Sequence, residues 1–242
     1  MQASSTVFGK RLDEAALLGT LKNTFGYSSF RSQQVDIVMS LLSGSDVFCM
    51  MATGSGKSMM FQLPAVALRE QSGVLATDLV ISPLVSLIED QVRLLCARGV
   101  SAIAIGGSST REEEEKAMKG DYTIIYSTPE KIGVWKYGLQ ALQTNTRIVC
   151  VAVDECHCAL EWGHDFRPAY SDLGVLRDWL PGVPMLALTA TATSTARDDI
   201  VRSLRLRPSA LLVCTTFNRP NLKYSVLNRT SNNDIVRVLL NM

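Results

Sequence analysis

Residues 51–58, with the sequence MATGSGKS, have the composition of a phosphate-binding loop. They follow an apolar run, 47–51, that predicts a short buried strand, and they precede residues that predict the start of a helix. Glycines allow backbone N–H groups to converge on one point, and a helix N-terminus adds partial positive charge. The strict G-x-x-x-x-G-K-[ST] motif is not met, because Met51 stands where its first glycine belongs. A Gly-Ser-Gly loop can also be an ordinary turn, but the Lys-Ser that follows favours phosphate binding.

Within this run, Lys57 is expected to reach the β- and γ-phosphates of a nucleoside triphosphate, and the Ser58 hydroxyl to hold Mg²⁺. The residues expected to contact the nucleotide are Thr53, Gly54, Ser55, Gly56, Lys57 and Ser58.

Two adjacent carboxylates, Asp154 and Glu155, directly follow a second apolar run at 148–153. Ligands of parallel sheets lie at the carboxyl ends of the strands, so both acids are expected at the edge that carries the phosphate loop. Asp154 is suited to hold Mg²⁺, directly or through water, and Glu155 to orient the attacking water and accept its proton. An acidic pair after a strand is also a common helix N-cap. The phosphate loop upstream favours the catalytic interpretation.

Apolar runs alternate with helical patterns along the whole chain. The runs cover 47–52, 79–82, 101–105, 122–126, 148–153, 184–189 and 210–214, and the helical patterns include 11–24, 35–42, 84–98 and 196–206. Continuous apolar strands that alternate with amphipathic helices predict a mostly parallel sheet covered on both faces. The sequence therefore predicts an α/β fold, a three-layer sandwich. The acidic run 111–116 predicts only a solvated helix face.

The composition excludes several classes of protein. With 242 residues, 47% of them hydrophobic and 19% charged, the chain is expected to fold as one large α/β domain or two small ones. A net charge of +1 argues against a strongly basic nucleic-acid clamp. Neither a signal peptide nor a membrane-spanning run is expected. The six cysteines include no C-x-x-C pair, which favours reduced thiols in an intracellular compartment and disfavours a zinc site at 156–158.

Taken together, these motifs resemble those of superfamily 2 helicases, and more narrowly those of the RecQ DNA helicases. The residues Asp154-Glu155-Cys156-His157 resemble the D-E-x-H box, and T-G-S-G-K-S is the helicase form of the phosphate loop. Five further stretches match the RecQ pattern: 25–34, 62–65, 82–91, 161–168 and 188–193. The resemblance implies a P-loop NTPase with a RecA-like fold, an N-terminal segment at 1–24, a helicase ATP-binding domain at 25–221, and a linker with the start of a second lobe at 222–242.

The resemblance also implies roles for individual residues around ATP. Tyr27 and Arg31 would sandwich the adenine ring, and the Gln34 amide would recognise its edge. His157 would sense the nucleotide state through the linker motif that contains Thr189 and Thr191.

Single-stranded or partly duplex DNA is the partner that the resemblance implies. Trp162, Phe166 and Arg167 would stack on unpaired bases, although Phe166 could instead support the loop. Residues at the ends of β-strands would contact the phosphates of the DNA, namely Ser82, Pro83, Thr128, Pro129 and Glu130. Gln91 would act in the segment 82–91, which couples the sheet to single-stranded DNA. Thr128-Pro129 is also a good helix start in its own right.

The implied activity is that of an ATP-dependent 3′–5′ DNA helicase, which acts in recombination, repair and replication and resides in the nucleus. RecQ helicases take an arginine finger from a second RecA-like lobe, which this sequence does not contain, so the chain is expected to bind ATP and hydrolyse it poorly alone. Asn218 stands where the family usually has Asp. One alternative is a non-catalytic nucleotide or single-strand binder, or a regulatory isoform. An RNA helicase lobe is disfavoured, because it would need a D-E-A-D-type box.

Overall fold

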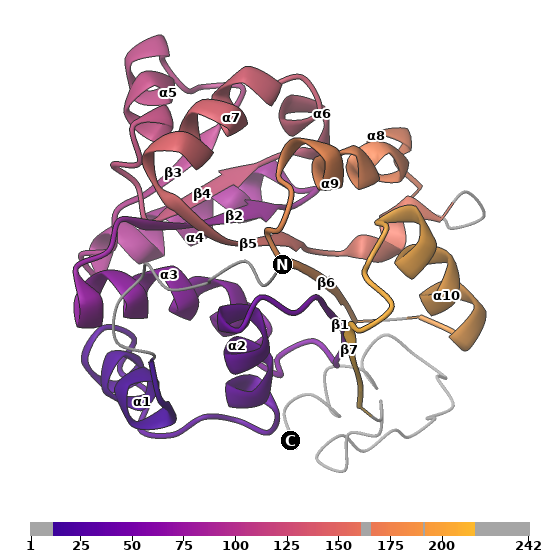
Figure 1. Ribbon diagram of the computed structural model, residues 1–242, viewed down its shortest axis with the longest axis horizontal. Coiled ribbons are helices and arrows are strands. Elements are labelled where there is room, and N and C mark those ends of the chain that lie inside the picture. The colour runs from indigo at the N-terminus through magenta and orange to yellow at the C-terminus, as the bar shows by residue number, and fades with distance from the viewer. Residues whose placement is uncertain (1–11, 161–165, 191, 216–242) are drawn as a thin grey trace, which may run out of the picture.

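The computed structural model describes residues 12–160, 166–190 and 192–215. Their centre is a seven-stranded, entirely parallel sheet with the strand order β3-β4-β2-β5-β6-β1-β7 (Figure 1). The strands are β1 Val47–Met50, β2 Ala76–Ile81, β3 Ala102–Ile105, β4 Ile124–Ser127, β5 Arg147–Val153, β6 Met185–Thr189 and β7 Leu211–Cys214. Each of the seven apolar runs of the sequence is therefore a strand, and the predicted α/β fold is confirmed.

Helices cover both faces of this sheet, which makes three layers. They are α1 Glu14–Asn23, α2 Gln34–Leu42, α3 Met59–Ser72, α4 Val85–Ala97, α5 Arg111–Met118, α6 Pro129–Ile132, α7 Lys136–Asn145, α8 Pro168–Ser171, α9 Leu176–Trp179 and α10 Ser194–Ser203, with 3₁₀ turns η1 Cys156–Ala159 and η2 Asp172–Val175. Helices α1 to α4 pack on one face and α5 to α10 on the other (Figure 1). Neighbouring strand residues alternate between these two cores, as Phe48 and Cys49 do. None of the described helices has the length and apolarity needed to cross a membrane.

Asp46, the residue before β1, anchors the amino edge of the sheet. Its carboxylate is fully buried and accepts hydrogen bonds from the Arg177 guanidinium at 2.7 Å, the Met185 N–H at 2.9 Å and the Arg207 N–H at 2.8 Å. The Arg207 guanidinium also lies 3.2 Å from it. Because Met185 begins β6 and Arg207 precedes β7, this one side chain ties together three neighbouring strands. No local motif in the sequence marks it.

We predict that Asp46→Ala lowers the free energy of unfolding by about 3–5 kcal/mol, because two guanidinium groups and two N–H groups lose a buried partner. Urea unfolding followed by circular dichroism measures the change. Asp178→Ala is the matched control, because Asp178 forms an exposed 2.9 Å ion pair with Arg205 and is expected to cost less than about 1 kcal/mol. Equal losses in the two variants would contradict the anchoring role.

Asp78 is a buried carboxyl group inside the sheet. Strand β2 begins three residues before the predicted apolar run, because the polar residues Thr77 and Asp78 belong to the strand and find hydrogen-bond partners within the protein. The Thr77 hydroxyl donates to Tyr122 O at 2.8 Å. Asp78 accepts from the Ala65 N–H at 2.7 Å, beside Pro64 in α3, and from the Cys150 thiol at 3.3 Å. Burial raises the pKa of Asp78 from 3.8 to about 7.

This pKa predicts a pH-dependent stability with a definite sign. A carboxyl whose pKa is higher in the native than in the unfolded state binds its proton more tightly when folded. The free energy of unfolding should therefore fall as the pH rises from about 4 to about 7, and then level off. Asp78→Asn cannot titrate, so its stability relative to the wild type should improve over this interval. Thermal unfolding at pH 5, 6, 7 and 8 tests the prediction, and parallel pH curves would refute it.

Candidate functional site

The phosphate loop connects β1 to α3 at the carboxyl edge of the sheet. Gly54 and Gly56 have φ angles of +82° and +88°, which are left-handed conformations that favour glycine. A Cβ atom on Gly56 would lie 2.6 Å from Gln34 Nε2, so only glycine fits at that position without a shift. Ser58 is the N-cap residue of α3, which aims the positive end of this helix at the loop.

Polar groups of the loop remain available to a ligand. The Lys57 ammonium donates to Met51 O at 3.0 Å, which occupies one of its three protons. Among the described residues, the buried Ser55 hydroxyl has no hydrogen-bond partner. A lysine and a hydroxyl beside a helix N-terminus match the oxygens of a phosphate chain. The residues present therefore fit the triphosphate of a nucleotide.

The acid pair follows β5 at the same edge. Only β6 lies between β1 and β5, so the two strands are about 10 Å apart at the spacing of a sheet. Glu155 has φ +49°, and its N–H donates to the Asp154 carboxylate at 3.0 Å. Burial, and then the neighbouring Glu155 charge, raise the pKa of Asp154 to about 6, while the Lys57 ammonium lowers it. The Lys57 ammonium is thus close enough to Asp154 to influence the pKa of this carboxyl group.

His157 and Thr189 connect the acid pair to the phosphate loop. The His157 Nδ1 atom lies 3.0 Å from the Thr189 hydroxyl and 3.3 Å from the Glu155 carboxylate. Thr189 is the buried last residue of β6, and its carbonyl accepts a hydrogen bond from the Met51 N–H at 3.1 Å. This chain of contacts crosses from β5 through β6 to β1. It gives a physical path for the coupling role expected of His157 and Thr189. Thr191 lies outside the described part of the chain.

Two of the three residues expected at the adenine ring, Arg31 and Gln34, bind the phosphate loop. Arg31 donates to Gly54 O at 2.6 Å, and Gln34 Nε2 donates to Gly56 O at 3.0 Å. Gln34 Oε1 accepts from the Arg31 N–H at 2.8 Å. The Gln34 amide therefore retains one N–H and one lone pair for a ligand. Tyr27 is 46% exposed and lies in the wall of a cavity beside the loop.

A cavity of about 240 Å³ opens between these residues and α4. Its wall includes Tyr27, Arg31, Gln34, Gly56, Ser58, Gln62, Gln91, Leu94 and Arg98. Sequence reasoning missed Leu94 and Arg98, because they belong to no motif. The spacing of Gln91, Leu94 and Arg98, three and then four residues apart, could have indicated that they share one face of α4.

Arg167 brings together two of the segments expected at DNA. Its guanidinium donates to Pro83 O at 2.7 Å and lies 4.0 Å from the exposed Glu130 carboxylate. Thr128 caps α6 and Pro129 is its first residue, so the helix-start interpretation of this pair is correct. Phe166 is only partly exposed. Trp162 and the segment 217–221 lie outside the described residues.

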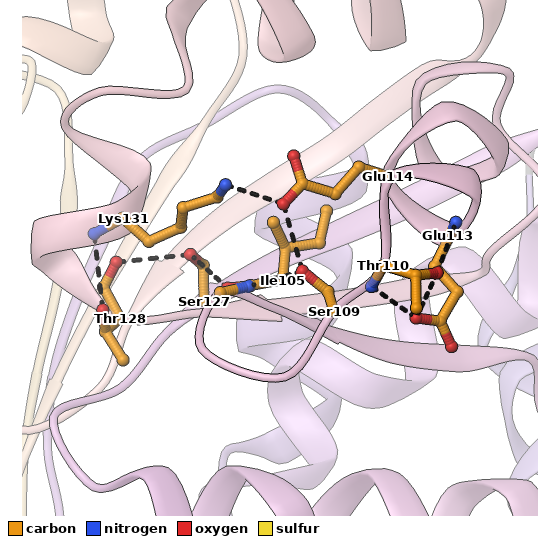
Figure 2. Close-up of polar contacts among 9 residues, drawn as sticks. Ile105, Ser109, Thr110, Glu113, Glu114, Ser127, Thr128 and Lys131 are labelled. Atoms are coloured by element: carbon orange, nitrogen blue, oxygen red, sulfur yellow. Dashed lines mark hydrogen bonds and ion pairs between the residues drawn. The ribbon is translucent and has the colours of Figure 1, made fainter.

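A polar network holds the Thr128 segment in place (Figure 2). The Lys131 ammonium contacts the Glu114 carboxylate at 2.7 Å, and the Ser109 hydroxyl donates to the same carboxylate at 3.0 Å. The Ser127 hydroxyl donates to Ile105 O at 3.2 Å. Glu114 belongs to the acidic run that the sequence predicts as a solvated face. Its half-buried side chain corrects that prediction, because it faces α6 and joins α5 to it.

Two of the residues expected at DNA have contacts within the protein. The Ser82 N–H donates to Ser127 O at 3.1 Å, and the Ser82 hydroxyl is buried without a hydrogen-bond partner among the described residues. Gln91 lines the nucleotide cavity and accepts a hydrogen bond from Gln62 at 2.7 Å. The roles expected of both residues at the single strand stay predictions.

Comparisons with known proteins agree with this geometry. The model of the DEAD/DEAH box helicase family matches residues 31–199. The ATP-dependent DNA helicase Q-like 2 of Arabidopsis thaliana is 40% identical over 218 residues, which are 86% of this chain and 30% of that protein. The ATP-dependent DNA helicase RecQ of Haemophilus influenzae is 38% identical over 226 residues, 92% of this chain and 35% of that one. The chain thus spans about a third or less of the length of the curated relatives it matches.

Solved structures support the fold in particular. The crystal structure of the DUF1998 helicase MrfA matches this chain with a TM-score of 0.65 at 17% identity. The match includes 83% of this chain and 32% of the MrfA chain. At that identity the likeness concerns the architecture alone. The family model, in contrast, matches well over half of the sequence and includes both the phosphate loop and the acid pair. The chain therefore belongs to the DEAD/DEAH box helicase family, and within it is similar to the RecQ helicases.

Proposed function

We propose that this chain is the nucleotide-binding lobe of an ATP-dependent DNA helicase of the RecQ type, which unwinds DNA in the 3′–5′ direction during recombination, repair and replication. One observation carries the proposal. The phosphate loop follows β1 and the acid pair follows β5 at the same edge of the sheet, and Arg31 and Gln34 donate hydrogen bonds to Gly54 and Gly56 of the loop. Such a lobe works where the DNA is, which is the nucleus in a eukaryotic cell.

The chain's own residues divide the chemistry between them. Backbone N–H groups of residues 54–58 and the Lys57 ammonium hold the triphosphate, and Ser58 and Asp154 hold Mg²⁺, which neutralises charge on the phosphates when bound. Since the pKa of Asp154 is about 6, this carboxylate is largely ionised at pH 7 and able to bind a cation. Glu155 orients the attacking water and accepts its proton.

Two observations support DNA as the partner: the names of the relatives and the surface near Arg167. The two relatives named above are DNA helicases by name. On this chain, the Arg167 guanidinium and the N-termini of α4 and α6 offer donors to the phosphates of a single strand. A second RecA-like lobe is the implied partner, because an arginine finger supplied by such a lobe typically contributes 10³–10⁵ in rate.

The Lys57→Ala variant should lose nucleotide binding. Removal of a desolvated ammonium that faces phosphates costs roughly 2–5 kcal/mol, which corresponds to at least about a 30-fold weaker affinity. Titration with a fluorescent ATP analogue in the presence of Mg²⁺ measures this affinity. Lys116→Ala, on the exposed face of α5, is the control and should bind as the wild type does. Equal nucleotide affinities for the wild type and Lys57→Ala would contradict the proposed binding of phosphates by Lys57.

Glu155→Gln should separate binding from hydrolysis. The amide keeps the size of the side chain but cannot accept the proton of water, so nucleotide affinity should change less than about threefold while turnover falls by about 10²–10⁴. The measurement is ATP turnover with single-stranded DNA, in this chain joined to the second lobe of a RecQ relative. Glu115→Gln on α5 is the control.

The same experiment separates the proposed enzyme from a non-catalytic binder. A joined wild-type protein that binds nucleotide and single strands without turnover would support the binder. Full turnover in Glu155→Gln would reassign the general base.

A further inference from the structure

Arg98 of α4 lies in the wall of the nucleotide cavity, although it belongs to none of the motifs of the sequence. On the same face of this helix, Gln91 accepts a hydrogen bond from Gln62, which lies in the first turn of α3 after the phosphate loop. Arg98 follows Gln91 by seven residues, which is about 10 Å along the axis of a helix. The two residues therefore line different parts of the cavity, and Gln91 is the one joined to the helix of the phosphate loop.

The surroundings of Arg98 place it beside a residue expected at the base. Its guanidinium carbon lies 5.9 Å from the centre of the Phe25 ring, which is a cation–π contact. Phe25 is buried in the core, so this contact holds the guanidinium at the cavity wall. Phe25 stands two residues before Tyr27, which lines the same cavity together with Leu21 of α1. This part of the cavity therefore suits the base of ATP and not its phosphates.

The hydrogen-bond donors of Arg98 are not used inside the protein. No ion pair or hydrogen bond engages its guanidinium within the described part of the chain. Arg69 and Arg177, in contrast, donate to backbone carbonyls and to the Asp46 carboxylate. A guanidinium has five N–H donors and no acceptor. Arg98 therefore offers a set of free donors at the wall of the cavity.

Adenine has acceptors that the other residues expected at the base leave unpaired. The Gln34 amide retains one N–H and one lone pair, which match N7 and the 6-amino group on one edge of the base. The ring nitrogens N1 and N3 lie outside this edge, and both are acceptors. A group that carries only donors, on the α4 side of the cavity, complements either of them.

We propose that Arg98 recognises the base of the nucleotide by donating a hydrogen bond to the ring nitrogen N1 or N3 of adenine. Arg98 is then a substrate-binding residue of α4, in addition to Tyr27, Arg31 and Gln34, and this role rests on the proposed function above. Because the Phe25 ring already holds the guanidinium at the cavity wall, little side-chain entropy is lost when the base binds. A hydrogen bond from a charged donor in such a place corresponds to an affinity gain of about tenfold or more.

Single-atom changes of the nucleotide test this contact. In 1-deaza-ATP and 3-deaza-ATP a C–H group replaces N1 or N3, and in 7-deaza-ATP it replaces N7. The dissociation constant of each nucleotide for the whole chain with Mg²⁺ is measured by competition against an ATP analogue that carries a fluorophore on its ribose. We expect the wild type to bind either 1-deaza-ATP or 3-deaza-ATP about tenfold more weakly than ATP.

Substitution of Arg98 should remove this discrimination. Arg98→Met keeps an unbranched stem against Phe25 and removes the donors, so it should bind ATP about tenfold more weakly and bind that deaza analogue within about twofold of ATP. Its discrimination against 7-deaza-ATP, which reports on Gln34, should equal that of the wild type. Arg93→Met is the matched control, because Arg93 is an exposed residue of the same helix that pairs with Asp90, and it should show the wild-type ratios. Arg98→Leu replaces Arg98→Met if that variant does not fold.

A cation at the C-cap of a helix also stabilises that helix through its dipole. A role confined to stability would lower the unfolding midpoint of Arg98→Met and leave its ratios between ATP and the deaza analogues at the wild-type values. That result would overturn the inference, and so would equal affinities of the wild type for ATP, 1-deaza-ATP and 3-deaza-ATP. In both cases ATP still binds and the proposed function stands. A wild-type chain that binds no ATP would instead refute the proposed function, and the inference with it.

Discussion

The pairing of β6 with both β1 and β5 is the constraint on which the candidate site depends. Backbone hydrogen bonds set neighbouring strands about 4.8 Å apart, so one intervening strand fixes the separation of the phosphate loop and the acid pair. The same strand ends in Thr189, which bonds to Met51 on one side and lies against His157 on the other. The distance between lysine and carboxylates is therefore a property of the sheet. The strands set the positions of these side chains, and the loops set only their orientations.

Buried polar groups keep the sheet in that register. A parallel sheet with helices on both faces excludes water, so a carboxyl group inside it must find its partners in the protein. Asp46 finds four donors at the amino edge, and Asp78 finds an N–H and a thiol in the interior. Burial raises the pKa of Asp78 to about 7, and its hydrogen bonds offset only part of this rise. If β1 shifted by one residue relative to β6 and β7, Asp46 would lose its hydrogen bonds from both Met185 and Arg207.

Periodicity and motifs predict most of the fold and the centre of the site. The seven strands, the phosphate loop and the acid pair are visible in the sequence, because each is a local pattern of apolar runs, glycines or adjacent acids. Contacts between distant segments are not visible in this way. Gln62 and Gln91 are 29 positions apart, and Asp46 and Arg207 are 161 apart, so no window of sequence relates them.

The use of arginine explains how a nearly neutral chain could still hold a nucleic acid. Most guanidinium groups of the described residues are engaged within the protein. Arg69 binds backbone carbonyls, Arg177 and Arg207 bind Asp46, and Arg31 binds the phosphate loop. Arg167 differs, because its ion-pair partner among the described residues is the exposed Glu130 carboxylate at 4.0 Å, and such a pair contributes less than about 1 kcal/mol. A phosphate can therefore replace Glu130 at little cost, while the bond to Pro83 keeps the guanidinium in place. With few cations of this kind, a bound strand would rely on helix N-termini and backbone N–H groups, and its affinity would depend only weakly on salt.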